Sequence, residues 1–423
     1  MVTIKVENPR LRLPVYLIID DGVPLYLRDL ITWGNKKPPD LVQYRLAKKQ
    51  FSGKTRYTEA DRFLTALTDI TAKNGIKGKL SVVPYVPEIG LLDRLSPECP
   101  EKPAVEKFLE TVRNKLMDSF DITPEMLTHD RTFDLETKNL LNEKEWLWCD
   151  NQSAKTLEEY IALALQVLKN CGLNPNGVTS PNDFGTRIEN RYVSALLNAT
   201  KKVCGRSFAW YFLNAAGNGF PRLMYLNRAR KEAVMSVVDI ISDIGLRRKN
   251  GDGLGSNVDA FLGADGKSGY LAELAESGSP LPLCMHWWLM YSNGKLTGLK
   301  ILDRIAGRIN RIYGKRAVWM KCSELAEYYA AANTFRSHYR SDANRTTIEI
   351  DTPFPCRDFT IRLTGLPAIG KAEIFREKGY REMALRESRS HPGDVLPSNS
   401  WRQDNNTTCV CFDARDKTIL KLQ

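Results

Sequence analysis

Residues 14–22 read PVYLIIDDG, and this stretch decides the fold that we expect. Residues 15–19 form an unbroken apolar run, and two aspartates and a glycine follow it directly. A run without polar alternation is typical of a strand that is buried on both faces, as in a parallel sheet covered by helices. Asp20 and Asp21 then stand where the carboxyl end of that strand meets its following loop.

Seven further short apolar runs follow before residue 325, and amphipathic stretches separate them. The runs are residues 80–86, 125–128, 177–180, 208–212, 234–241, 281–287 and 317–320. Strands that alternate with helices form parallel sheets, and this number of repeats favours closure of the sheet. The sequence therefore predicts an α/β fold, a (β/α) barrel of about seven to eight strands.

Three helices between or after these runs carry clear end signals. Thr156, followed by Glu159, matches a capping box at the start of one helix. Apolar residues between positions 302 and 312 recur at helical spacing, and Gly314 is expected to end that helix. Ser323 is predicted to cap the last helix of the barrel.

The pattern changes near residue 341. TTIEIDT at 346–352, FTIRLTG at 359–365 and TTCVCFD at 407–413 alternate with a period of two. Such alternation between turn residues predicts antiparallel strands with one buried face. We therefore divide the chain into a barrel over residues 1–340 and a small sandwich-like β domain over residues 341–423.

Composition limits the classes of partner and compartment. The net charge is +11, but the basic clusters are scattered, so we expect no nucleic-acid partner. No apolar run approaches the roughly 18 residues of a membrane helix. Residues 1–12 lack the apolar core of a signal peptide, which predicts a cytoplasmic protein, or a secreted one if a leader was removed. The nine cysteines are odd in number and never form CxxC, which favours a reducing compartment.

Polar residues at the predicted strand ends are the candidates for chemistry, because the active site of a parallel barrel lies at those ends. Two of the four histidines fall there. The candidates are Asp20, Asp21, His129, Asp134, Asp183 and His286. Three aromatic residues that follow His286 offer either a stacking surface for a sugar ring or core packing, and they are Trp287, Trp288 and Tyr291.

Four segments in this order resemble the motifs of the polysaccharide deacetylases, a family of carbohydrate esterases. They are IIDDG at 18–22, LTHDRTFD at 127–134, TSPNDFG at 179–185 and PLCMHWW at 282–288. The resemblance extends over roughly residues 14–330. It implies a hydrolase that removes acyl groups from a glycan with the help of a bound divalent metal, for which zinc is the expected ion.

The resemblance also implies roles for individual residues. Asp20 is the expected general base, Asp21 and His129 are expected metal ligands, and His286 is the expected acid that protonates the leaving group. The family has a second histidine four residues after the first, where this chain has Phe133. Two replacements are expected for it: Asp134, one residue further, as an oxygen ligand, or a water at the vacant position. Asp183 and the three aromatic residues are expected to bind the substrate.

Two other functions fit the same residues. A glycoside hydrolase needs two carboxyl groups as acid and base, and the candidates are Asp21 with Asp134, Asp183 or Glu273. A catalytically inactive glycan-binding protein is the other alternative, and the phenylalanine at the ligand position favours it. A purely structural role is a further alternative for these residues, because aspartates at strand ends also cap helices and a histidine with apolar neighbours also suits a hydrophobic core. All three functions imply a carbohydrate partner, whereas the glycan and the oligomeric state are not indicated.

Overall fold

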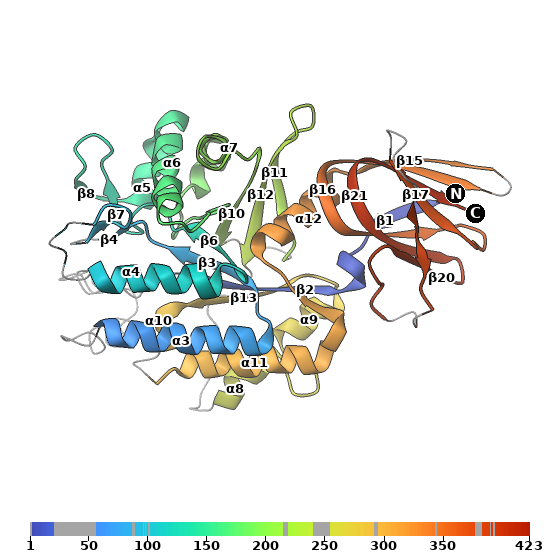
Figure 1. The fold of residues 1–423 in the computed structure, drawn as a ribbon, viewed down its shortest axis with the longest axis horizontal. Coiled ribbons are helices and arrows are strands. Elements are labelled where there is room, and N and C mark those ends of the chain that lie inside the picture. The colour runs from blue at the N-terminus through green and yellow to red at the C-terminus, as the bar shows by residue number, and fades with distance from the viewer. Residues whose placement is uncertain are drawn as a thin grey trace.

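The computed structural model shows an α/β region joined to a C-terminal β domain (Figure 1). It describes residues 2–20, 56–86, 89–95, 97, 99, 102–214, 219–239, 254–291, 295–342, 345–376, 383–389, 391 and 394–423. Asp21 lies outside these residues. Both chain termini lie at the β domain (Figure 1).

Strand β2 (Leu13–Asp20) lies at the centre of the first parallel sheet, and all eight of its residues are buried. Its residues alternate between two hydrophobic clusters. Leu17 and Ile19 face a cluster shared with the outer helices, whereas Tyr16 and Ile18 face the side where the other parallel strands converge. Each buried aliphatic side chain contributes roughly 1.5–3 kcal/mol to folding. Burial on both faces explains why the sequence of this strand is continuously apolar.

The parallel strands form two hydrogen-bonded sheets. The first has the order β13-β2-β3-β6, with β14 also pairing β2, and the second has the order β11-β12-β10-β9, in which β11 is antiparallel. The bounds of the remaining strands are β3 (Gly78–Val82), β6 (Phe120–Pro124), β9 (Val178–Thr179), β10 (Phe208–Asn214), β11 (Arg222–Asn227), β12 (Glu232–Asp239), β13 (Leu281–His286) and β14 (Ala317–Trp319).

The two sheets meet on one side through a parallel bridge between Glu125 and Thr179. On the other side, the Tyr16 hydroxyl of β2 donates a hydrogen bond of 2.7 Å to the Val238 carbonyl of β12. Within the described residues no strand register joins β12 to β13. The predicted parallel α/β fold is therefore confirmed, whereas closure into a complete barrel is not.

Helices cover both outer faces of these strands, with one group below the sheet and another above it in Figure 1. The lower group comprises α3 (Arg56–Asn74), α4 (Lys102–Thr111), α8 (Leu254–Phe261), α9 (Tyr270–Glu276), α10 (Trp287–Tyr291) and α11 (Thr297–Tyr313). The upper group comprises α5 (Glu145–Trp148), α6 (Ala154–Asn170) and α7 (Glu189–Cys204). Helical single turns are η1 (Pro9–Leu11), η3 (Val112–Leu116), η4 (Cys149–Asn151), η5 (Thr186–Ile188) and η6 (Gly314–Arg316).

Three details of the sequence prediction were wrong. The cap of α6 is Ser153, whose hydroxyl accepts the amide of Thr156 at 3.1 Å, so the helix begins earlier than the capping box suggested. Residues 125–128 follow β6 instead of forming a strand. The N-cap of α12 (Cys322–Thr334) is Lys321, and the side chain of Glu324 accepts its amide hydrogen at 2.9 Å.

Two short hairpins extend the chain beyond the carboxyl ends of β3 and β6. The first pairs β4 (Tyr85–Val86) with β5 (Gly90–Leu91), and the second pairs β7 (Arg131–Phe133) with β8 (Leu140–Lys144). They lie at the end of the α/β region that is away from the β domain (Figure 1).

The β domain is built on two long antiparallel strands, β16 (Thr346–Thr364) and β21 (Thr407–Leu422). Register shifts near Cys356 bend this pair, so that each strand has different neighbours along its two halves. The neighbours include β1 (Thr3–Val6), which comes from the other end of the chain and pairs with residues 361–364 of β16. The remaining strands are β15 (Arg336–Ser341), β17 (Ala372–Arg376), β18 (Met383–Ala384), β19 (Arg386–Glu387) and β20 (Ser400–Asp404).

Helix α12 lies between the parallel strands and the β domain (Figure 1). Its beginning is held by the buried carboxylate of Asp121 on β6, which accepts the Ser323 amide at 2.7 Å and the Ser323 hydroxyl at 2.8 Å. Burial raises the pKa of Asp121, and these hydrogen bonds oppose that shift. Ile18, Leu325 and Ile350 belong to one hydrophobic cluster, so strands, helix and β domain share a core.

No helix in the described part of the chain is both long and apolar enough to cross a membrane. The nine cysteines all lie among the described residues, and none of them forms a disulfide. Eight of them are buried, and Cys204 is partly exposed.

Candidate active site

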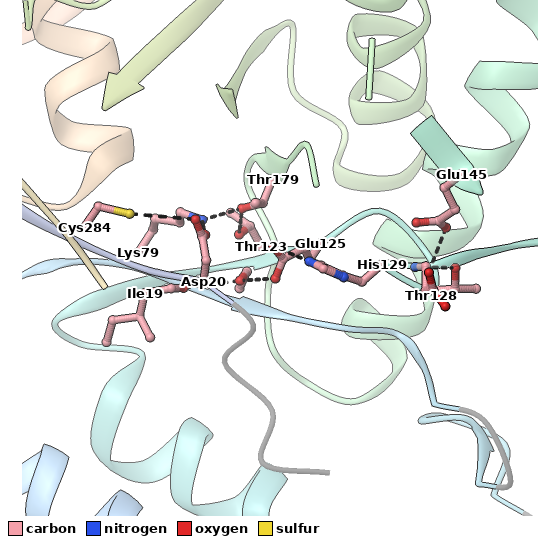
Figure 2. A network of polar contacts seen from close by, with 12 residues as sticks. Ile19, Asp20, Lys79, Thr123, Glu125, Thr128, His129, Glu145, Thr179 and Cys284 are labelled. Atoms are coloured by element: carbon pink, nitrogen blue, oxygen red, sulfur yellow. Dashed lines mark hydrogen bonds and ion pairs between the residues drawn. The ribbon is translucent and has the colours of Figure 1, made fainter. Parts of the chain in front are cut away.

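Polar side chains line the inward face of the parallel strands toward their carboxyl ends. Figure 2 shows them as groups of contacts that follow one another from Cys284 on β13 to Glu145 on α5. Buried polar groups require hydrogen-bond partners, and this cluster supplies them from several strands at once. Its members come from β2, β3, β6, β9, β13, α5 and the loop after β6.

Asp20 and Lys79 form a buried ion pair at the centre of the cluster. The Asp20 side chain is 9% exposed and the Lys79 side chain is fully buried. The ammonium group also donates to the Thr179 hydroxyl at 2.6 Å and lies 4.4 Å from the centre of the Phe212 ring. The Lys79 ammonium compensates the negative charge of the Asp20 carboxylate, and this compensation is what allows both charges to lie in the interior.

Ser81 lies two residues after Lys79 and therefore faces the same side of β3. Its hydroxyl donates to the Glu125 carboxylate at 2.6 Å, and Glu125 is buried. The other carboxylate oxygen lies 3.5 Å from Nε2 of His129. Glu125 thus stands between a hydroxyl donor and an imidazole, an arrangement in which a carboxyl group can exchange a proton.

The loop that carries His129 is held from the opposite side by Glu145. One carboxylate oxygen of Glu145 accepts the amides of Leu127 at 3.1 Å and Thr128 at 2.8 Å, and the Tyr160 hydroxyl at 2.5 Å. His129 itself has a positive φ of 65°, which is uncommon for a residue with a side chain. Burial raises the pKa of Glu145, against the effect of these hydrogen bonds.

His286 ends β13 and is the register partner of Asp20 on the adjacent strand. Neighbouring strands lie about 4.8 Å apart, so the two residues start from adjacent positions. The side chain of His286 is partly exposed, unlike that of Asp20. Cys284, two residues earlier, places its sulfur 4.0 Å from the second carboxylate oxygen of Asp20.

The structure brings Asp20, His129 and His286 to one end of the strands, but it places Asp134 in a turn. The carboxylate of Asp134 accepts the amides of Glu136 at 2.7 Å and Thr137 at 2.9 Å, within the β7–β8 hairpin. These amides lower its pKa. Asp183 is exposed in the loop after β9, where its carbonyl accepts the Thr186 amide at 3.0 Å.

The predicted aromatic platform lies largely in the core. Trp287 and Tyr291 on α10 are buried in the cluster formed with the outer helices. The Trp287 ring meets that of Phe63 on α3 edge to face, with centroids 5.8 Å apart. The side chain of Trp288 lies outside the described residues.

The expected metal ligands do not converge in the part of the chain that the structure describes. Asp134 is engaged by its own turn, and Phe133, at the position of the family's second histidine, packs against Tyr85 with ring centroids 5.1 Å apart. The described residues contain no group of three histidine, cysteine, aspartate or glutamate side chains arranged to hold a metal ion. The described residues therefore do not fit the expected ligand set, and since Asp21 lies outside them, the zinc site stays a prediction.

Sequence reasoning missed Lys79, Glu125 and Glu145. Lys79 precedes the apolar run of β3, and a lysine inside a fully buried strand is a signal for a buried ion pair. Glu125 was assigned to a strand, although it lies at a strand end like the other candidates. Glu145 had no signal in the sequence, because its partners lie in a loop 17 and 18 residues earlier.

Comparisons with known proteins yield only distant structural similarity. No family model and no curated protein matches the chain. Among solved structures, the endo-β1,6-glucanase BT3312 shows 10% identity, covers 99% of this chain and 93% of its own, and has a TM-score of 0.33. An α-fucosidase from Thermotoga maritima shows 12% identity, with coverages of 98% and 97% and a TM-score of 0.28. The glycoside hydrolase family 30 xylanase Xyn30A from Clostridium acetobutylicum shows 9% identity, with coverages of 85% and 92% and a TM-score of 0.28. At these TM-scores the similarity identifies neither a family nor an activity.

Proposed function

We propose that the protein is a carbohydrate-active hydrolase of the glycoside hydrolase type, with Asp20 and Glu125 as its two reacting carboxyl groups. The observation that supports this is that both carboxyl groups contact side chains of the same strand, β3. Asp20 contacts Lys79 and Glu125 contacts Ser81, and these partners are alternate residues of β3. Alternate residues of a strand are roughly 6.5–7 Å apart. Glycoside hydrolases hold their carboxyl pairs about 5–5.5 Å apart when they retain the configuration and about 6.5–9.5 Å apart when they invert it.

The surroundings of the two groups suit different roles. At the separation of inverting enzymes, Asp20 takes the proton of the water that attacks the sugar carbon as the glycosidic bond breaks. Glu125, with Ser81 and His129 at its two oxygens, gives its proton to the leaving oxygen. His129 and His286 are partly exposed, so they lie on the side of the pair from which a sugar approaches.

The test is hydrolysis of a panel that contains xylan, β-1,6-glucan and aryl α-fucosides, followed by reducing-end release. On a substrate that is turned over, Glu125→Gln is expected to lower kcat by about 10²–10⁴-fold. The matched control is Glu276→Gln, because this carboxylate is exposed at the end of α9, before β13 begins and away from the carboxyl ends of the strands. Full activity in a folded Glu125→Gln variant contradicts the proposal.

A second function has one observation in its favour. Asp20 and His286 are register partners on adjacent strands, which is the placement that a base and an acid for acyl transfer need. An acyl hydrolase of this kind loses activity on acetylated xylan in His286→Ala and retains it in Glu125→Gln. The glycoside hydrolase proposal predicts the opposite response to Glu125→Gln on unacetylated polymer, so the two functions are separable.

A further inference from the structure

A pocket lies at the ends of the parallel strands opposite to the candidate active site, where the strands meet the β domain. Its volume is about 640 Å³, which lies within the usual range for small-molecule sites. Residues of η1, β14, α12, β16 and β21 line it. Since β2 spans eight residues at about 3.3 Å each, this pocket lies roughly 25 Å from Asp20. It is therefore separate from the candidate active site.

Four arginines surround this pocket, and none has a carboxylate partner among the described residues. Arg10 donates to the Leu396 carbonyl at 3.0 Å, and Arg12 donates to the Lys315 carbonyl at 2.8 Å. Neutral carbonyls orient these guanidinium groups without cancelling their charge. Arg357 on β16 and Arg415 on β21 are exposed, and their side chains make no hydrogen bond within the described part of the chain.

The acidic residues of the pocket are already engaged. Glu324 accepts the Lys321 amide at 2.9 Å and lies 3.8 Å from the ammonium of Lys77, the fifth basic residue of the lining. Glu327 pairs with Arg206 at 2.7 Å. The carboxylate of Asp413 accepts the Asp358 amide at 3.1 Å, and the carboxylate of Asp358, the fourth acidic residue of the lining, accepts the Cys411 thiol at 3.6 Å.

The positive charges also act on one another. The pKa of Arg12 is lowered first by burial and then by the neighbouring charge of Arg10, against the opposing effect of Asp358. Arg10 and Asp358 both have a positive φ, 56° and 51°, although neither is a glycine. Strained backbone of this kind clusters at binding sites, where the surrounding fold holds it in place.

From this arrangement we infer that the pocket binds a small organic anion, a carboxylate or phosphate carried on a ring-sized body. Guanidinium groups bind both anions through paired hydrogen bonds. Trp319 and Tyr328 supply apolar surface on the same lining for the body of the ligand. Because residues of both regions line the pocket, the bound anion bridges the parallel strands and the β domain. This inference does not depend on the proposed catalytic function.

Calorimetric titration tests the inference with four probes at roughly millimolar concentration: glucuronate, glucose 6-phosphate, inorganic phosphate and glucose. We expect at least one of the two charged sugars to bind and glucose not to bind. Binding of glucuronate alone identifies a carboxylate site, and binding of glucose 6-phosphate with inorganic phosphate identifies a phosphate site. The affinity should fall as salt is added, because the attraction is between charges.

The decisive variant is Arg357→Gln/Arg415→Gln, which removes the two exposed guanidinium groups. Loss of charge-assisted hydrogen bonds is expected to weaken binding at least about tenfold. The matched control is Arg336→Gln/Arg340→Gln on β15, which removes two exposed arginines of the same domain that do not line the pocket. An unchanged unfolding midpoint without ligand shows that both variants are folded. Unaltered affinity in the first variant, equal binding of glucose, or no binding of any probe overturns the inference.

Discussion

Replacing Lys79 with methionine tests how the centre of the candidate site is held together. The side chain of Lys79 is fully buried and that of Asp20 is 9% exposed, so water cannot replace the ammonium group once it is removed. Methionine keeps the unbranched side chain that lies by the Phe212 ring, so packing changes little. Removing one partner of a buried ion pair costs about 3–5 kcal/mol, because the other charge is left without compensation.

The assay is urea-induced unfolding at neutral pH of four proteins: the parent, Lys79→Met, Asp20→Asn and the double variant. We expect Lys79→Met to lower the free energy of unfolding by about 3–5 kcal/mol. The double variant should recover about 2–3 kcal/mol of that loss, since no unpaired charge remains. The exposed pair Lys231–Asp416, with side chains 56% and 68% exposed, is the matched control, and Lys231→Met should change stability little.

Two results refute this reasoning. One is a loss below about 1 kcal/mol in Lys79→Met, which is the range of an exposed pair. The other is a double variant that is as unstable as Lys79→Met, because the cost then does not come from the uncompensated carboxylate.

Three further predictions follow from groups around the site. Burial raises the pKa of Glu145 above its ordinary value of 4.5, so the folded protein is destabilised as the pH rises and this carboxyl group loses its proton. Glutamine cannot lose a proton in this way. Glu145→Gln should therefore gain stability relative to the parent from about pH 5 upward, as measured by urea unfolding. Two backbone amides lower the pKa of Asp134 below 3.8, so Asp134→Ala should be less stable than the parent at neutral pH, and the difference in melting temperature should vanish in acid. Burial raises the pKa of Cys149 to about 12, so this thiol should react slowly with iodoacetamide at pH 8. Cys204, the described cysteine that is not buried, should be labelled before Cys149 when the native protein is treated and then analysed by mass spectrometry.

Much of the fold was predictable because the composition of a short segment indicates which of its faces are buried. A strand covered on both faces must be continuously apolar, and residues 15–19 and 281–285 have that composition. Alternation with a period of two reports a half-buried antiparallel strand, as in β16 and β21. The same local reasoning placed Asp20 and His286 at strand ends, and the structure has both residues there.

Only the tertiary structure decided which side chains meet. The partner of Asp20 is Lys79, 59 residues away, because β2 and β3 pair in a particular register and both residues face inward. Trp287 follows His286 in the chain but turns to the outer helices, since the strand ends between them. β1 joins the C-terminal sheet across more than 350 residues. Composition determines whether a residue is buried, whereas its partner depends on register and on the face it presents, and these are set by contacts between segments that are distant in the sequence.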